Sequence, residues 1–134
     1  MMYHMLVSIK QTNTGYSTMD PFKFWCFNPD EQHGLRNTED VIFLQRDQSY
    51  TICDIEVGFH GDKGPNGSRG TIQSFAKVGP KTIIGHSHSP GIHEGVYQVG
   101  VSTRLDLEYV SGPSSWLQTH CIIYNSGHRT VLIS

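Results

Sequence analysis

Residues 81–90 read Lys-Thr-Ile-Ile-Gly-His-Ser-His-Ser-Pro, and this stretch decides how the rest of the chain is interpreted. Its first half is short, apolar and β-branched, which is typical of a buried strand. Directly after it come two histidines with one residue between them. Side chains alternate along an extended backbone, so both imidazoles of a His-X-His pair lie on one face. The stretch therefore predicts a strand that ends in a metal-binding pair, His86 and His88.

A second strand is predicted over residues 50–59, where large apolar side chains recur with a period of two. It ends directly before His60. Residues 68–78 then carry apolar side chains at helical spacing, with Asn66 or Ser68 as the N-cap. Strand, helix and strand in this order predict a βαβ unit with parallel strands. The carboxyl ends of parallel strands share one sheet edge, so His60 is expected to meet the downstream histidines there.

The loop over residues 61–70 is rich in glycine and leads into the expected helix. Helix N-termini present free N–H groups that suit phosphate, and Arg69 can add a two-pronged hydrogen bond. Ser68 and Arg69 are therefore candidate residues for binding phosphate or substrate. The alternative is a tight connection that uses glycine for positive φ. Asp62 either orients His60 from behind or is an ordinary turn residue.

Two blocks carry a resemblance to a known family. Residues 58–62 (Gly-Phe-His-Gly-Asp) and 83–90 (Ile-Ile-Gly-His-Ser-His-Ser-Pro) resemble the last two motif blocks of calcineurin-like metallophosphoesterases. The stretch 67–70 and the segments 112–116 and 119–124 resemble phage-encoded members of that family. An apolar strand leading into Gly-His-X-His is a fairly specific motif when a histidine block precedes it.

The resemblance covers the C-terminal part of the chain, residues 40–134. It implies an α/β (α+β) fold, a partial metallophosphoesterase-type β-sandwich with one βαβ crossover and several antiparallel strands. It also implies hydrolysis of a phosphomonoester or phosphodiester at a centre of one or two divalent metal ions, Mn, Zn or Fe. His60 and His86 would bind one metal and His88 the other. Paired metals activate a hydroxide and neutralise charge on the phosphoryl group.

The sequence departs from the family where the upstream blocks should be. The patterns DxH, GDxxD and GNH(D/E) do not occur before residue 60. The bridging aspartate is therefore missing from this chain, and no catalytic residue is assigned. One expectation is a phosphoesterase that is incomplete as a single chain, with further ligands from a second polypeptide or from a homo-oligomer. The alternative is a non-catalytic metal-binding or interaction fragment of a split phosphoesterase.

A cupin-like barrel is a further alternative. His86, His88, Glu94 and His120 come close to the His-X-His, Glu, His ligand set of cupins. That fold is all-β, so a helix between the two predicted strands would count against it. The remaining histidines are expected at the surface or in packing, with His93 as a reserve ligand. Trp116 is expected in the core.

Length and charge restrict the other possibilities. The 134 residues suit one domain, with residues 1–39 as an N-terminal loop or short helical segment. The net charge of −2 does not indicate nucleic-acid binding, although nucleotides and nucleic acids stay candidate substrates. No apolar run suits a membrane span, so no membrane partner is expected. The three cysteines are expected to be reduced and buried, in a cytoplasmic protein or in the host cytoplasm of a phage.

Overall fold

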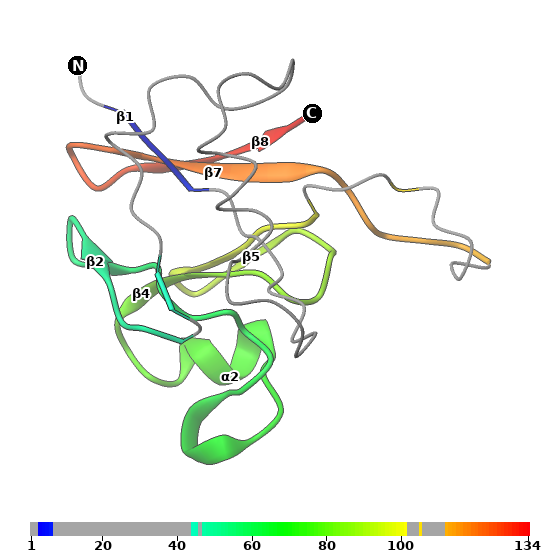
Figure 1. Cartoon of the computed structure of the whole chain (residues 1–134), viewed down its shortest axis with the longest axis horizontal. Coiled ribbons are helices and arrows are strands. Elements are labelled where there is room, and N and C mark those ends of the chain that lie inside the picture. The colour runs from blue at the N-terminus through cyan, green and yellow to red at the C-terminus, as the bar shows by residue number, and fades with distance from the viewer. Residues whose placement is uncertain (1–2, 7–43, 46, 102–104, 106–111) are drawn as a thin grey trace, which may run out of the picture. The chain divides into compact units, whose positions relative to one another are not determined.

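The computed structural model describes residues 3–6, 44–45, 47–101, 105 and 112–134, and for residues 3–6 it describes the backbone path. In chain order the elements are β1 (Tyr3–Leu6), β2 (Thr51–Ile52), β3 (Ile55–Glu56), η2 (Pro65–Gly67), α2 (Ile72–Ala76), β4 (Lys81–Ile84), β5 (Gly91–His93), β6 (Val96–Gln98), β7 (Thr119–Tyr124) and β8 (Arg129–Ile133). They form a three-stranded sheet, β1-β7-β8, called sheet A here, and a five-stranded sheet, β2-β3-β4-β6-β5, called sheet B (Figure 1). Mixed sheets with little helix make this an α+β arrangement.

The predicted βαβ unit is the centre of sheet B. β3 and β4 pair in parallel, with Ile55 opposite Lys81, and α2 lies between them in the chain. β4 also pairs in parallel with β6, while β5 and β2 are antiparallel to their neighbours. The carboxyl ends of β3, β4 and β6 therefore lie at one edge of the sheet, as the sequence predicted for β3 and β4.

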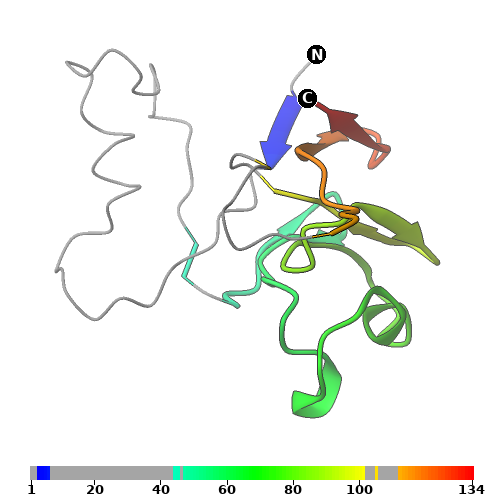
Figure 2. The same cartoon turned by 90° about the vertical axis from the view of Figure 1, so that its right-hand side faces the viewer.

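Two apolar clusters cover the two faces of sheet B. On one face, Ile55 and Ile83 pack with Cys121 and Ile123 of β7. On the other face, Ile84 and Val96 pack with Phe75 of α2. Adjacent residues of β4 point to opposite faces because side chains alternate along a strand. Figures 1 and 2 both show α2 on the side of sheet B that lies away from β7 and β8.

The strand expected over residues 50–59 is a hairpin instead. β2 and β3 pair antiparallel with Ile52 opposite Ile55, so the loop has two residues. Both of them, Cys53 and Asp54, have positive φ, at 49° and 60°. Two-residue hairpin loops require this backbone, and glycine or asparagine usually marks them. Residues 53 and 54 are neither glycine nor asparagine, so the usual sequence mark of a hairpin turn is missing here. The break in apolar alternation near Cys53 was the remaining indication of the turn. Cys53 is exposed on this turn, which makes the prediction of a buried thiol wrong there, while Cys121 is buried as expected.

The expected helix is shorter than predicted and begins later. α2 has Thr71 as its N-cap, and the side chain of Thr71 accepts from the amide of Ser74. The side chain of Ser74 accepts from the amide of Thr71 in return, which completes a capping box. Asn66 and Ser68, the predicted N-caps, instead belong to η2 and to its C-cap. A glycine-rich stretch gives little helical preference, so the helix starts only where this box forms.

The mild helical pattern of the first 12 residues is also overridden. Residues 3–6 form β1, which pairs antiparallel with β7 from Tyr3 opposite Tyr124 to Leu6 opposite Cys121. Pairing with a distant strand outweighs a weak local preference. Most of the expected N-terminal segment lies outside the described residues. The sequence also favours strands over residues 40–44 and 105–110, and of these two ranges the structure describes residues 44 and 105.

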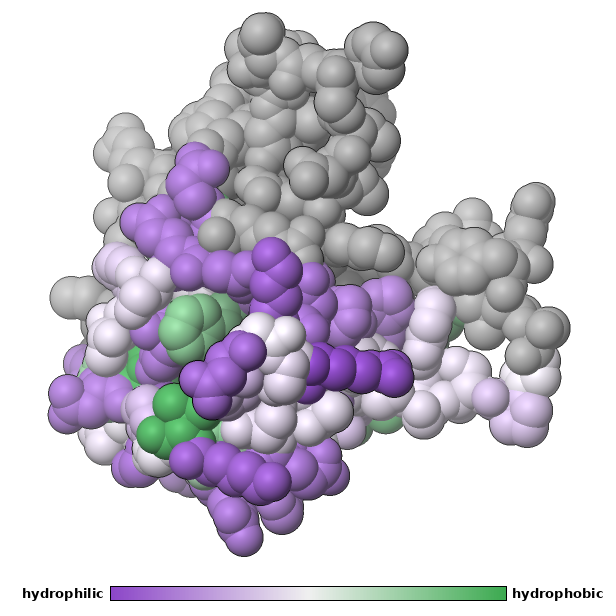
Figure 3. All heavy atoms as spheres, turned by 90° about the horizontal axis from the view of Figure 1, so that it is seen from below, coloured by the Kyte–Doolittle hydropathy of each residue, from purple (hydrophilic) through white to green (hydrophobic). Residues whose placement is uncertain are grey.

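The sequence Asn125-Ser-Gly127 is typical of a hairpin turn, and the structure confirms this interpretation. β7 and β8 pair antiparallel around this turn, and Gly127 has a φ of +77°. Among the described residues, no helix is both long and apolar enough to cross a membrane. Seen from the α2 side, hydrophilic residues cover most of the described surface and the apolar areas are small (Figure 3). That view of the described residues offers no broad apolar docking face.

Candidate metal centre

Two of the three predicted ligands meet at the carboxyl edge of sheet B. The Nε2 atom of His60 and the Nδ1 atom of His86 are 3.2 Å apart, and their ring centroids are 5.2 Å apart. Two nitrogens about 2.05 Å from a tetrahedral metal ion lie roughly 3.3 Å from each other. The pair therefore has the separation of two ligands of one cation. Without a metal, the same geometry suits an N–H···N hydrogen bond in which one ring is the donor.

Backbone contacts hold His60 against the end of β4. The amide of His60 donates to Oδ1 of Asp47 at 3.1 Å. The carbonyl of His60 accepts from the amide of Gly85 at 3.0 Å. Gly61 has a φ of +108°, and a Cβ there would lie 3.1 Å from the Gly85 carbonyl. The close approach of these two strand ends is what brings the imidazoles together.

A buried carboxylate fixes the chain that leads to His60. Glu56 accepts hydrogen bonds from the hydroxyl of Ser49 and from the amides of Tyr50 and Gly58. Burial alone raises the pKa of Glu56, but these hydrogen bonds together outweigh burial and lower the pKa below its ordinary value. Glu56 is therefore charged, and it ties the β2–β3 hairpin to the segment that carries His60.

The His-X-His stretch is not extended, which corrects the prediction that both rings share a face by alternation. His86 and His88 have φ values of 69° and 64°, both in the left-handed region. Histidine is more tolerant of this region than most residues, yet such a conformation still costs on the order of 1 kcal/mol. Strained backbone of this kind clusters at functional sites, so its position supports a role for this loop.

His88 contacts a tryptophan. Its ring centroid lies 4.3 Å from that of Trp116, in an edge-to-face arrangement with an interplanar angle of 80°. No three His, Cys, Asp or Glu side chains gather into a metal-binding group within the described residues. Of the three imidazoles predicted to cluster, those of His60 and His86 lie together. The role of His88 as a metal ligand stays a prediction.

The phosphate loop departs from its predicted form. Ser68 and Arg69 precede the N-cap Thr71, so they do not lie at the start of α2. The hydroxyl of Ser68 donates to the carbonyl of Pro65 at 2.8 Å. Arg69 lies opposite Lys63 in an isolated antiparallel bridge, and both residues are exposed.

Lys63 and Arg69 form a pair of like charges. The amides flanking them bond across the bridge, from Gly64 to Ser68 and from Gly70 to Asp62. This pattern makes Lys63 and Arg69 a non-hydrogen-bonded pair, the closer type in antiparallel strands, with Cα atoms about 4.5 Å apart. Like charges directly opposite each other are destabilising, and an anion between them would relieve the repulsion.

The cupin alternative does not fit. The helix α2 occupies the interval between β3 and β4, where a cupin barrel would be all-β. His120 lies in β7 and Glu94 in the turn between β5 and β6, and neither gathers with His86 into a group of three in the described part of the chain. The reserve ligand His93 lies in β5, opposite Val96.

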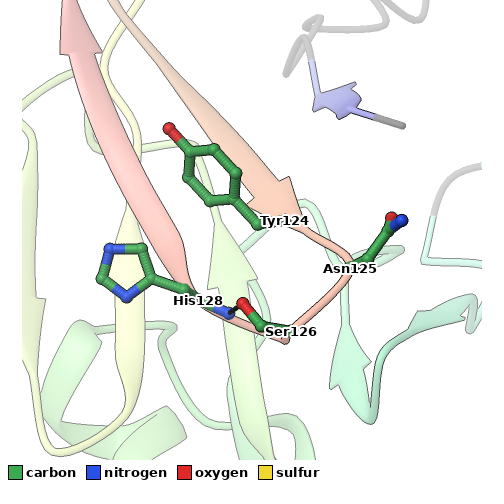
Figure 4. Close-up of a pocket in the computed structure, with 4 residues that line it drawn as sticks. All are labelled: Tyr124, Asn125, Ser126 and His128. Carbon is green, nitrogen blue, oxygen red and sulfur yellow. Dashed lines mark hydrogen bonds between the residues drawn. The ribbon is translucent and has the colours of Figure 1, made fainter. Parts of the chain in front are cut away.

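A shallow hollow lies at the β7–β8 turn of sheet A, away from the two imidazoles. It is lined by Tyr124, Asn125, Ser126 and His128 (Figure 4). The rings of Tyr124 and His128 are 5.7 Å apart. The thiol of Cys53, in the turn before β3, reaches the Tyr124 carbonyl at 3.8 Å. The hollow therefore adjoins the amino end of β3, whereas His60 follows its carboxyl end.

Comparison with known proteins shows similarity to a phage protein. Protein A1 of Escherichia phage T5 is 50% identical to this chain over 93 residues, which are 69% of this chain and 16% of that protein. The chain therefore spans about one sixth of the length of this relative. No family model and no solved structure matches the chain. The similarity to a phage protein supports the expected bacteriophage origin.

Three residues around the centre were not predicted as site residues, and of these Trp116 was expected in the core. Asp47 and Glu56 hold the backbone around His60, and Trp116 contacts His88. In β3 both Ile55 and Glu56 are buried, so alternation along the strand did not reveal the inward carboxylate. Nothing local marks Asp47 or Trp116, because they lie 13 and 28 residues from the histidines they contact.

Proposed function

We propose that this chain contributes to the metal centre of a metal-dependent phosphoesterase, with His60 and His86 as ligands of one divalent ion. The single observation that carries this proposal is the 3.2 Å separation of the two ring nitrogens at the carboxyl edge of sheet B. A divalent ion bound there would supply Lewis acidity and an activated hydroxide. Mn, Zn and Fe all accept imidazole ligands.

The remaining residues have separate parts in this proposal. Lys63 and Arg69 would bind an oxyanion of the phosphoester, since their paired charges favour an anion. Asp47 and Glu56 hold the backbone of the His60 segment, so they would keep the two imidazoles in register. Ser68 can add one further contact if its hydroxyl turns from Pro65. Asp62 would orient His60, and His88 keeps the role that the resemblance implies, in binding a second ion.

The proposed fold is part of a metallophosphoesterase-type β-sandwich, and the proposed enzyme is larger than this chain. A pair of imidazoles leaves a tetrahedral site two ligands short. The phage relative is about six times as long as the matched region, so there is room in such a protein for a bridging carboxylate. A second polypeptide or a second copy of the chain would serve equally.

Thermal unfolding with and without Mn²⁺ or Zn²⁺ tests the metal site. At a metal concentration 100 times the dissociation constant, binding adds about 2.7 kcal/mol to the free energy of unfolding, which raises Tm by on the order of 10 °C. The double variant H60A/H86A should lose this rise. The matched control H93A/H120A removes two histidines elsewhere in the sheets and should keep it. An identical metal response in the wild type and in H60A/H86A would refute the proposal.

The second candidate function is a non-catalytic metal-binding or interaction fragment of a split phosphoesterase. It is favoured by the absence of a three-ligand group within the described residues. Hydrolysis of bis(p-nitrophenyl) phosphate separates the two functions. Activity of the pure chain with Mn²⁺ supports the enzyme. Activity that appears only after a polypeptide with the missing DxH, GDxxD and GNH blocks is added supports an enzyme that is incomplete as a single chain. No activity with or without that polypeptide supports the non-catalytic fragment.

A further inference from the structure

The segment before β7 runs along the loop that carries His88. The amide of Leu117 donates to the carbonyl of His88 at 3.3 Å, and the carbonyl of Leu117 accepts from the amide of Val101 at 3.0 Å. The hydroxyls of Ser89 and Ser115 are 2.6 Å apart. These contacts place a stretch of chain nearly 30 residues downstream against the histidine loop.

Gly100 shows how closely these backbones approach. A Cβ at this position would lie 2.0 Å from the carbonyl oxygen of Leu117 and 3.0 Å from that of His88. Neither oxygen can move without breaking a hydrogen bond of the segment. The backbones around His88 and Leu117 are therefore fixed relative to the carboxyl end of β6.

Trp116 is the side chain that this arrangement directs at His88. The rings meet edge to face at 4.3 Å between centroids. Trp116 is partly exposed and belongs to neither apolar cluster of sheet B. The expectation of a core tryptophan was therefore wrong, and packing of the core does not account for its position.

We propose that Trp116 is a positioning residue that fixes the orientation of the His88 imidazole, so that the segment 112–118 forms one wall of the metal centre. His88 lies in a left-handed stretch with His86, where strand geometry does not set the direction of its ring. An edge-to-face aromatic contact restricts that ring to a narrow range of orientations. Outer partners that hydrogen-bond a ligating histidine commonly change metal affinity 10- to 100-fold when they are removed, and we expect removal of the Trp116 ring contact to have an effect in this range.

The experiment compares W116L and W116F with the control L117A. Trp116→Leu removes the aromatic ring, Trp116→Phe keeps one, and Leu117→Ala changes an exposed neighbour whose contact with His88 is made by the backbone. In metal-free protein, long-range ¹H–¹⁵N spectra of ¹⁵N-histidine report the tautomer of His88. We expect one dominant tautomer in the wild type, W116F and L117A, and averaging of both tautomers in W116L.

Calorimetric titration with Zn²⁺ gives the second readout. We expect Zn²⁺ affinity to fall 10- to 100-fold in W116L and less than about threefold in W116F and L117A. An unchanged His88 tautomer in W116L, or an equal loss in L117A, would overturn the positioning role. If W116L does not fold, ¹⁹F spectra of the wild type labelled with 5-fluorotryptophan decide, and they must show the Trp116 signal moving when His88 is replaced by Ala.

The positioning role of Trp116 rests on the proposed metal site, because a fixed His88 ring matters for metal binding. The experiments can nevertheless refute the metal site and the positioning role separately. Wild-type protein that binds no Zn²⁺ at all would refute the metal site, and the tautomer spectra of metal-free protein would still test the contact. Zn²⁺ binding that is indifferent to the residue at position 116 would refute the positioning role and leave the site formed by His60 and His86 intact.

Discussion

Sheet A and sheet B differ in where their backbone leaves ordinary conformations. In sheet A, β7 and β8 pair over five residues, and Gly127, which tolerates positive φ at little cost, makes the turn. In sheet B the strands are two to four residues long, and the loop after β4 places two histidines in the left-handed region. Sheet B therefore has left-handed non-glycine residues at its carboxyl edge, where the imidazoles meet, and also in its two hairpin turns, at Cys53, Asp54 and Glu94. The β7–β8 hairpin of sheet A uses glycine for its left-handed turn residue.

Arg129 links sheet A to sheet B through hydrogen bonds. It is buried, although it begins β8 of sheet A, and its guanidinium donates to the carbonyls of Thr82 and Gly95 in sheet B. The same group lies 4.0 Å from the centre of the Tyr97 ring. Burial lowers the pKa of Arg129, and the nearby Tyr97 and Cys121 partly oppose this effect.

The largest effect is therefore expected from Arg129→Met. The variant loses two hydrogen bonds from a charged donor and the contact with Tyr97, so we expect the free energy of unfolding to fall by about 3 kcal/mol. Urea denaturation measures it. Arg129→Lys, which keeps the charge and one donor, should lose roughly half as much. Wild-type stability in Arg129→Met would mean that the two sheets are held together by the apolar cluster alone.

The next effect concerns the support of the metal centre. Glu56→Gln keeps the shape of the side chain but removes the charge, and we expect a loss of about 2 kcal/mol. The pKa of Glu56 is lowered in the folded protein from its ordinary value of 4.5. Its contribution to stability is therefore fully present above that value and is lost as pH falls through the lower folded pKa.

Urea denaturation between neutral pH and acid pH checks this prediction. The stability of the wild type should decline more steeply on acidification than that of Glu56→Gln. Glu94→Gln removes an exposed carboxylate from the turn between β5 and β6 and serves as the control. Parallel pH profiles for the wild type and Glu56→Gln would contradict the assigned charge.

A smaller effect, opposite in sign between the two sheets, is expected for substitution of histidine by asparagine. Asn tolerates left-handed backbone well, so His86→Asn should stabilise the metal-free protein by a few tenths of a kcal/mol while it removes the metal response. His120→Asn lies in regular β7, where asparagine is unfavourable, and should destabilise by up to about 1 kcal/mol. The same sign for both variants would show that strain at His86 has no energetic weight.

The smallest effect is a difference in reactivity without any change in stability. Burial raises the pKa of the Cys121 thiol to about 11, and the positive charge of Arg129 opposes this only in part. Cys53 is exposed. In a Cys26→Ser background, we expect iodoacetamide to label Cys53 within minutes and to leave Cys121 unlabelled until urea is added. Prompt labelling of Cys121 in the native protein would show that the apolar cluster opens readily.

The sequence predicted the parallel pairing of β3 with β4 and the meeting of His60 with His86. Both follow from strand order and from the shared edge of parallel strands, which apolar periodicity reveals. The left-handed backbone at His86 and His88 was not predictable, because an apolar strand followed by His-X-His looks the same whether it continues or turns.

Other features escaped because they depend on distant partners. β1 forms only through pairing with β7, and Trp116 acquires its place through the Gly100 contact. α2 begins at Thr71 because of a capping box with Ser74, which uses Ser where the usual pattern has Glu or Gln. Local sequence preference carries no information on β1 or on the position of Trp116. For the start of α2 it was ambiguous.

The pairing of β1 with β7 has a consequence for the order of folding. Tyr3 lies opposite Tyr124, so this contact joins residues 121 positions apart (124 − 3), whereas the β7–β8 hairpin joins neighbours. Closing so long a chain loop costs more entropy than closing a hairpin, and contacts of wide sequence separation slow folding. We therefore expect β7 and β8 to pair early in folding and β1 to add to the free edge of β7 after that hairpin has formed.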